Sequence, residues 1–209
     1  MGQSHRRGGR LMQTWILIGL TVLVSWSGFE RPRLLDRLTL WPPAIDRHRQ
    51  YERLVTYGFV HADWMHLLFN MITLYFFGPL AERFYTQQLG PLGYPAFYFS
   101  ALVVSILPTY LRHRRDGAYR SLGASGAVSA VLFTFVLLAP WQTISVFFLP
   151  MPAIVFGAVY LGYSAWADRQ GHGNINHAAH FWGAVYGMAF AVFAAPQLPA
   201  AFVDQLLGR

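Results

Sequence analysis

The sequence predicts an all-α membrane protein with six transmembrane helices and an interfacial loop between the first two. Composition is the first observation behind this fold class: of 209 residues, 55% are hydrophobic and 12% are charged. That balance is too apolar for an ordinary soluble domain of this length. The second observation is that the apolar residues gather in stretches of roughly 20, the length that a helix needs to cross a hydrocarbon core of about 30 Å.

Six apolar stretches divide the chain. They are Leu11 to Phe29, His66 to Phe84, Pro91 to Leu111, Gly123 to Pro140, Ile144 to Trp166, and His177 to Ala195. We therefore expect a basic N-terminal arm over residues 1–10, a six-helix membrane domain over residues 11–195 and a short C-terminal tail over residues 196–209. In the fifth stretch, Pro150 and Pro152 are expected to kink the helix, because proline removes a helical hydrogen bond.

The first stretch could be mistaken for a signal peptide, because three arginines precede it in the N-terminal arm. The run from Leu11 to Phe29 is too long for a typical signal-peptide core, and it ends without an A-x-A-like cleavage site. We interpret it as a retained helix.

The segment from Arg31 to Arg53 follows, with six arginines and the helix breaker Trp41-Pro42-Pro43. Its mixture of basic and apolar residues suits a structured loop in the membrane interface. The net charge of +7 comes entirely from arginines, which lie at the ends of segments. This placement favours membrane lipids over nucleic acid as partners. The absence of cysteine excludes disulfides and thiolate metal sites.

Polar residues begin the second apolar stretch, where His61, His66 and Asn70 lie close together in the sequence. His66 and Asn70 are four residues apart, so they share one face of a helix and can donate hydrogen bonds to one point. Polar groups in a membrane segment are costly and are therefore functional candidates. Taken singly, each could instead be an interfacial residue bonded to loop backbone.

The third stretch ends in a basic cluster, and the fourth begins with Gly123-Ala124-Ser125-Gly126. A serine between small residues at a helix start can expose its hydroxyl, and the free N–H groups of the first turn can receive an oxyanion. By itself the pattern is weak, because small residues in membrane helices also serve close packing.

The sixth stretch carries Gly183 and Gly187, which form a G-x-x-x-G face for close approach by another helix. His180 lies near that face. If the approaching helix is the one that begins with Ser125, a base and a nucleophile come within reach of each other, as activation of a serine requires. The alternative is a packing histidine that donates to a backbone carbonyl.

In this order and combination, the three motifs resemble those of the rhomboid intramembrane proteases. The family signature H-x-x-x-x-H-x-x-x-N is matched by His61, His66 and Asn70. Its G-x-S-G motif is matched by Gly123 to Gly126, and its A-H-x-x-G-x-x-x-G motif by Ala179 to Gly187. The resemblance covers residues 50 to 190, approximately.

Further positions agree with the family or depart from it. Arg53, Gly78 and Glu82 fall where the family commonly has an arginine, a glycine and a glutamate. Glu52 replaces a tryptophan that often precedes the arginine. Ser129 stands where some members place an aromatic residue that stacks on the catalytic histidine. These departures concern the positioning of His180 and of the loop rather than the chemistry.

The resemblance implies an intramembrane serine endopeptidase that hydrolyses peptide bonds in or near transmembrane segments of its protein substrates. Ser125 would be the nucleophile and His180 its general base, with the oxyanion held by His66, Asn70 and the Ser125 N–H. No cofactor and no metal are expected. The remaining motif residues would support the site: His61, Gly123, Gly126, Gly183, Gly187, Arg53 and Glu82.

The orientation predicted by the resemblance conflicts with the charge distribution. The family implies an integral protein of the bacterial inner membrane with a cytoplasmic N-terminus and an active site that opens to the outer side. The positive-inside rule would instead place the arginine-rich loops after the first, third and fifth helices in the cytoplasm. We follow the resemblance, because a polar loop that lies in the interface need not obey a short-loop rule.

Three other functions compete with this interpretation. A non-catalytic rhomboid-like protein would bind transmembrane segments without cutting them. A rhomboid specialised for C-terminal sorting signals would be a protease with narrower substrates. A metal or haem protein would use His61, His66, His177 and His180, but the H-E-x-x-H pattern of zinc proteases does not occur.

Overall fold

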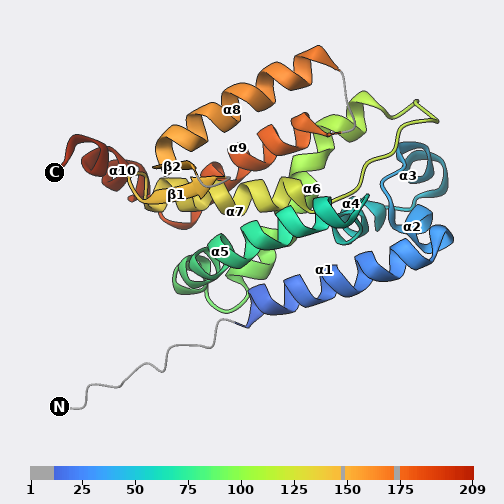
Figure 1. Ribbon diagram of the computed structural model, residues 1–209, viewed down its shortest axis with the longest axis horizontal. Coiled ribbons are helices and arrows are strands. Elements are labelled where there is room, and N and C mark those ends of the chain that lie inside the picture. Colours follow the sequence, from blue (N-terminus) through green and yellow to red (C-terminus); the bar gives the residue numbers. More distant parts are fainter. Residues whose placement is uncertain (1–11, 147–148, 172–174) are drawn as a thin grey trace.

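Figure 1 presents the computed structural model, which describes residues 12–146, 149–171 and 175–209. Long helices run side by side, with the short helices α2 to α4 at one end and the β-hairpin and α10 at the other. The elements are α1 (Gln13–Glu30), α2 (Pro32–Leu38), α3 (Pro42–His48), α4 (Arg53–Thr56), η1 (Tyr57–Phe59), α5 (Trp64–Leu89), α6 (Gly93–Arg112), α7 (Ser125–Leu138), β1 (Thr143–Val146), β2 (Leu149–Pro152), α8 (Ala153–Gln170), α9 (His177–Ala194) and α10 (Leu198–Leu207).

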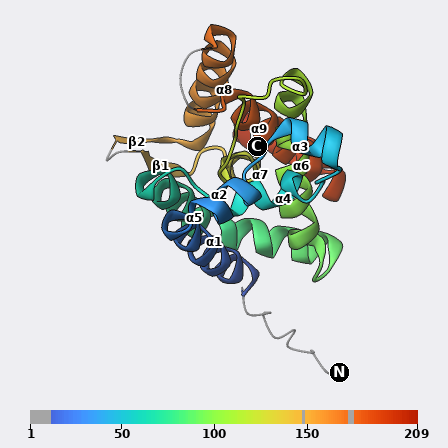
Figure 2. The same cartoon turned by 90° about the vertical axis from the view of Figure 1, so that its right-hand side faces the viewer.

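Helix α7 forms the centre of the bundle, and both views place other helices around it (Figures 1 and 2). It contacts α5, α6, α8 and α9. Eleven of its fourteen residues are buried, as expected for a helix that is apolar on every side. Ser125 is its first residue, so the start of the most buried helix carries the candidate nucleophile.

Two helices in the described residues, α5 and α6, are each long and apolar enough to cross a membrane. Helices α9 and α10 form a third candidate, because they pass the same test as a pair although the chain bends by 109° between them. These findings agree with an all-α membrane protein. Length and composition thus identify two or three crossings rather than the predicted six, and α7 is a shorter apolar helix of 14 residues.

The prediction for the fifth stretch is wrong in its first part. In place of a kinked helix from Ile144, an antiparallel hairpin pairs Thr143 with Pro152 and Val146 with Leu149. Helix α8 begins only at Ala153. Pro150 therefore lies in a strand and Pro152 directly before the helix, which are positions where the missing N–H and fixed φ of proline are tolerated.

The segments outside the six stretches also contain helices. Residues 31–53 form α2, α3 and the start of α4, and the C-terminal tail contains α10. The N-terminal arm of residues 1–10 lies outside the described part of the chain. The segment before Ser125 runs beside the short helices, where Leu40 and Ser121 form an antiparallel bridge.

Candidate active site

Close contact between α7 and α9 brings the two candidate catalytic helices together. A Cβ atom added to Gly183 would overlap the backbone carbonyl of Gly126, and one added to Gly187 would overlap the backbone carbonyl of Ala130. Glycine is therefore the residue that permits this approach at both positions. The helix that approaches the G-x-x-x-G face is thus the one that begins with Ser125, as the sequence interpretation requires.

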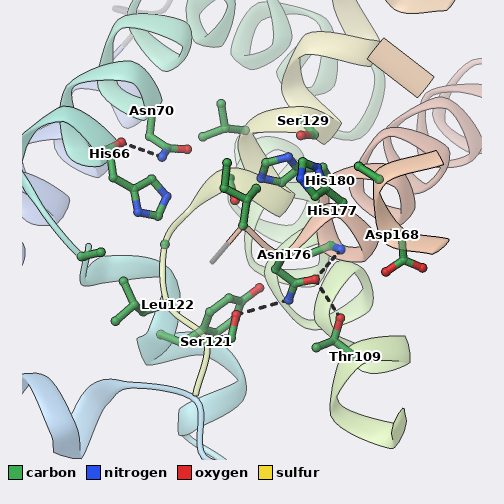
Figure 3. Close-up of a pocket in the computed structure, with 18 of the residues that line it drawn as sticks. His66, Asn70, Thr109, Ser121, Leu122, Ser129, Asp168, Asn176, His177 and His180 are labelled. Carbon is green, nitrogen blue, oxygen red and sulfur yellow. Dashed lines mark hydrogen bonds between the residues drawn. The ribbon is translucent and has the colours of Figure 1, made fainter. Parts of the chain in front are cut away.

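A cavity of about 1210 Å³ lies over this contact. Ser125, His180, His66 and Asn70 all line it, so the structure brings the four principal residues to one cavity. Figure 3 shows three of them, with the His66 and Asn70 side chains on one side of the cavity and His180 on the other. Ser125 and His180 are both half-buried. No hydrogen bond joins their side chains among the described residues.

The backbone before Ser125 takes an unusual path. Gly123 has a φ of +114°, a conformation that side-chain-bearing residues rarely adopt. A Cβ at this position would also lie 2.7 Å from His66 Nε2. The glycine of the G-x-S-G motif thus allows both the turn into α7 and the close approach of the His66 ring to the backbone beside the serine.

His66 and Asn70 are held by their own helix. The Asp63 carboxylate accepts a hydrogen bond from the His66 N–H at 2.8 Å and caps the start of α5. Asn70 Nδ2 donates to the His66 carbonyl at 2.9 Å. The Asn70 side chain is almost completely buried, with 5% of its surface exposed. Both residues therefore line the cavity from the first turns of α5.

His61 has a different environment from His66. It is completely buried, and its Nε2 accepts a hydrogen bond from the Ala124 N–H at 3.3 Å. The proton of the ring therefore sits on Nδ1, which donates to Ser25 Oγ at 2.9 Å. The Ser25 hydroxyl in turn donates to the Phe59 carbonyl at 3.0 Å. His61 thus connects α1 to the residue before Ser125.

His180 packs against an aromatic residue that sequence reasoning missed. The Tyr160 ring of α8 stacks on the His180 ring with centroids 6.1 Å apart and an interplanar angle of 22°. The Tyr160 hydroxyl is 2.5 Å from Ser129 Oγ on α7. The sequence does contain one indication of Tyr160, because a tyrosine hydroxyl in an apolar segment needs a polar partner. Its contact with His180 depends on the packing of α8, which the sequence does not reveal.

Two supporting residues from the sequence lie away from the cavity. Arg53 is buried and donates to the carbonyls of Asp36 at 2.7 Å and Thr39 at 2.6 Å, which fixes the segment between α1 and α5. Glu82 accepts hydrogen bonds from the N–H groups of Gln13 at 3.0 Å and Thr14 at 2.9 Å. It therefore caps the start of α1 from α5. Neither residue touches the candidate dyad.

Two groups of charged residues lie near the C-terminal end of α6, and one of them, the pair Arg112 and Asp168, also lines the cavity. Arg112 forms a bidentate pair with Asp168, with N–O distances of 2.9 and 3.0 Å, and so joins the ends of α6 and α8. The Tyr110 hydroxyl and the Arg114 guanidinium both donate to Asp46, and these bonds hold the pKa of that carboxyl below its ordinary value. The described residues contain no group of three or more His, Asp or Glu residues arranged to hold a metal ion.

Comparison with known proteins identifies a Rhomboid domain over residues 48–197. The chain is 30% identical to the Arabidopsis thaliana RHOMBOID-like protein 12, mitochondrial, over 81% of this chain and 54% of that protein. It is 28% identical to the Rhomboid protease GlpG of Klebsiella pneumoniae (strain 342), again over 81% and 54%. The human Presenilin-associated rhomboid-like protein, mitochondrial, is 30% identical over 65% of this chain and 36% of its own length. The chain thus spans about half the length of the first two relatives.

Proposed function

The chain belongs to the rhomboid family, and from this membership we propose that it is an intramembrane serine endopeptidase with a Ser125–His180 dyad. One observation carries the proposal: the glycine contact between α7 and α9 brings a serine and a histidine to the same cavity. The name of the bacterial relative, Rhomboid protease GlpG, supports proteolysis as the activity.

The proposed reaction uses groups that line the cavity. His180 takes the proton of the Ser125 hydroxyl while Ser125 Oγ bonds to the carbonyl carbon of the substrate. The negative oxygen is stabilised by His66, Asn70 and the Ser125 N–H, and each such donor is typically worth about 10²–10³ in rate. His180 then passes its proton to the leaving nitrogen as the C–N bond breaks. A water molecule attacks the acyl-enzyme by the same route and releases the carboxylate product and free Ser125.

The dyad must tighten when substrate binds. Ser125 and His180 share no hydrogen bond among the described residues. Catalytic hydrogen bonds are often long in free enzymes and shorten in the substrate complex. Ser125 begins α7, His180 lies on the helix packed against it, and both line one cavity, so the proposal requires their side chains to meet within that cavity.

The proposed membrane arrangement has six crossings, formed by α1, α5, α6, α7, α8 and α9, with residues 31–53 in the interface. Burial of α7 supports this arrangement, because a central helix shielded by its neighbours need not match the full hydrocarbon thickness. We propose that the N-terminus is cytoplasmic and that substrates are transmembrane proteins. The relatives come from mitochondria and chloroplasts as well as bacteria, so they support a membrane location and do not favour the bacterial inner membrane.

A fluorophosphonate probe tests the proposal directly, because it reacts with activated serines. Purified protein in detergent is expected to be labelled, and both Ser125→Ala and His180→Ala are expected to abolish labelling. Ser27→Ala is the control, since the Ser27 hydroxyl donates to Leu23 O of its own helix, far along the chain from the cavity residues. A folded wild-type protein that resists the probe would contradict the proposal.

A non-catalytic protein that binds transmembrane segments is the second candidate. The observation in its favour is that no hydrogen bond joins Ser125 to His180 among the described residues. Under this alternative, Ser125→Ala would leave binding and any cellular effect unchanged. Loss of the cellular effect in a Ser125→Ala variant that is expressed and folded like the wild type would exclude it.

A further inference from the structure

The segment that leads into Ser125 is held on one side by backbone hydrogen bonds. Ser121 exchanges two of them with Leu40: Leu40 N–H donates to Ser121 O at 2.9 Å, and Ser121 N–H donates to Leu40 O at 3.2 Å. Two residues later, Gly123 N–H donates to the Tyr57 carbonyl at 2.9 Å. This side of the segment is therefore fixed to the region between α1 and α5, not to the helix that carries the candidate base.

On the other side, the segment is held by one amide side chain, that of Asn176. Asn176 Nδ2 donates to Ser121 Oγ at 3.2 Å. Asn176 Oδ1 accepts from Thr109 Oγ1 at 3.0 Å and from Ala179 N–H at 3.0 Å. Figure 3 shows these bonds converging on the amide, with Ser121 and Thr109 approaching it from different elements. The amide thus joins the end of α6, the segment before α7 and the first turn of α9.

The orientation of this amide is determined by its partners. Its oxygen faces two donors and its nitrogen faces a hydroxyl oxygen, so each group meets a complementary atom. The backbone of Asn176 also bonds to the backbone of His180, because the Asn176 carbonyl accepts a hydrogen bond from the His180 N–H at 3.3 Å. Asn176 is therefore bonded both to the first turn of the helix that carries His180 and to Ser121, four residues before Ser125.

From this geometry we propose that Asn176 is a positioning residue that sets the relative placement of Ser125 and His180. The inference rests on the proposed function, since it concerns the same dyad. Its side chain completes a path from the base to the nucleophile through Ser121, independent of the glycine contact between α7 and α9. An ordinary helix cap would need only the bond to Ala179 N–H. The bond to Ser121 is the part of the arrangement that acts on the nucleophile.

Ser121→Ala and Thr109→Val separate positioning from stability. Each removes one hydroxyl hydrogen bond to the Asn176 amide, so the two variants are expected to lose similar amounts of thermal stability. Ser121→Ala alone breaks the connection between the nucleophile segment and α9. We expect its limiting rate of fluorophosphonate labelling to fall by roughly threefold to tenfold, the effect of one net hydrogen bond. Thr109→Val keeps the bond between Asn176 and Ser121. Its labelling rate is therefore expected to stay within about twofold of the wild-type rate.

The concentration dependence of labelling provides the decisive comparison. A positioning effect lowers the limiting rate and leaves the half-saturating probe concentration unchanged, and Ser121→Thr, which keeps the hydroxyl, is expected to restore the rate. Equal limiting rates for Ser121→Ala and Thr109→Val would overturn the inference while leaving the proposed protease intact. A wild-type protein that is not labelled at all would overturn the proposed function itself and the inference with it.

Discussion

Gly183→Ala is expected to slow the labelling of Ser125 strongly, because the added methyl group has no room between α7 and α9. Its Cβ would overlap the carbonyl oxygen of Gly126 and lie 2.8 Å from the carbonyl carbon, whereas ordinary contacts begin at 3.4 Å. The obstructing atoms belong to the backbone, so no side-chain rotation relieves the overlap. The oxygen is the nearer of the two atoms, so the two helices must separate by about 1 Å or more to restore an ordinary contact.

This separation occurs beside the candidate dyad. Gly126 directly follows Ser125, and Gly183 lies three residues after His180 on the same helix. A misplacement of about 1 Å between reacting groups can cost about 100-fold in rate. We therefore expect labelling to slow by about 10- to 100-fold. Overpacking typically destabilises a protein by about 1–3 kcal/mol, and the better helix propensity of alanine offsets about 0.5–1 kcal/mol of that.

Gly162→Ala is the matched control for this variant. Gly162 lies within α8, and a Cβ at that position would meet no atom within 4 Å. The control gains the same helix propensity without an overlap, so its labelling rate should equal that of the wild type and its Tm should be equal or higher. The measurements are labelling time courses and thermal denaturation in detergent. A Gly183→Ala protein with wild-type labelling and wild-type Tm would refute the close-contact argument.

Two further predictions concern residues around the dyad and at the far end of α5. Tyr160→Leu is expected to lower the labelling rate by about twofold to tenfold, since an aromatic pair is worth about 0.5–1.5 kcal/mol. Tyr160→Phe should keep the stack on His180 and most of the rate. Equal rates for the two variants would contradict a role for the ring. Glu82→Gln is expected to lower the unfolding free energy by about 1–3 kcal/mol, because an amide offers one acceptor to the two N–H groups at the start of α1. Thermal denaturation measures this loss, and an unchanged Tm would show that the Glu82 hydrogen bonds to the start of α1 do not contribute to stability.

The sequence anticipated those parts of the fold and site that follow from local patterns. The G-x-x-x-G face of Gly183 and Gly187 predicted a close helix contact near His180, and the contact lies at that face. The apolar stretches predicted most helix positions to within a few residues, because a membrane helix needs a continuous apolar run. The sequence placed the start of the fourth helix at the G-x-S-G motif, from Gly123, and α7 begins two residues later at Ser125.

Other features depend on contacts between segments that are distant in the chain, and local patterns in a single sequence do not predict such contacts. The hairpin before α8 was misread as helix because its residues are apolar, and periodicity alone does not distinguish a short apolar strand from a buried helix. Tyr160 and Asn176 were missed for a related reason. Each acts through a partner more than 30 residues away along the chain, although the position of Asn176 directly before a helix matches the preference of asparagine for N-caps.

His61 and His66 belong to the same sequence motif but have different environments in the structure. Their rings lie with centroids 4.9 Å apart. His66 lines the cavity, whereas both ring nitrogens of His61 are already engaged, one by Ala124 N–H and the other by Ser25. A protonated His61 would present a second N–H to the Ala124 N–H and break that bond. Only the neutral ring can therefore hold the residue before Ser125 in place. Under the proposed function, His61 would thus support the nucleophile, and His66 would be the histidine that meets a substrate oxygen.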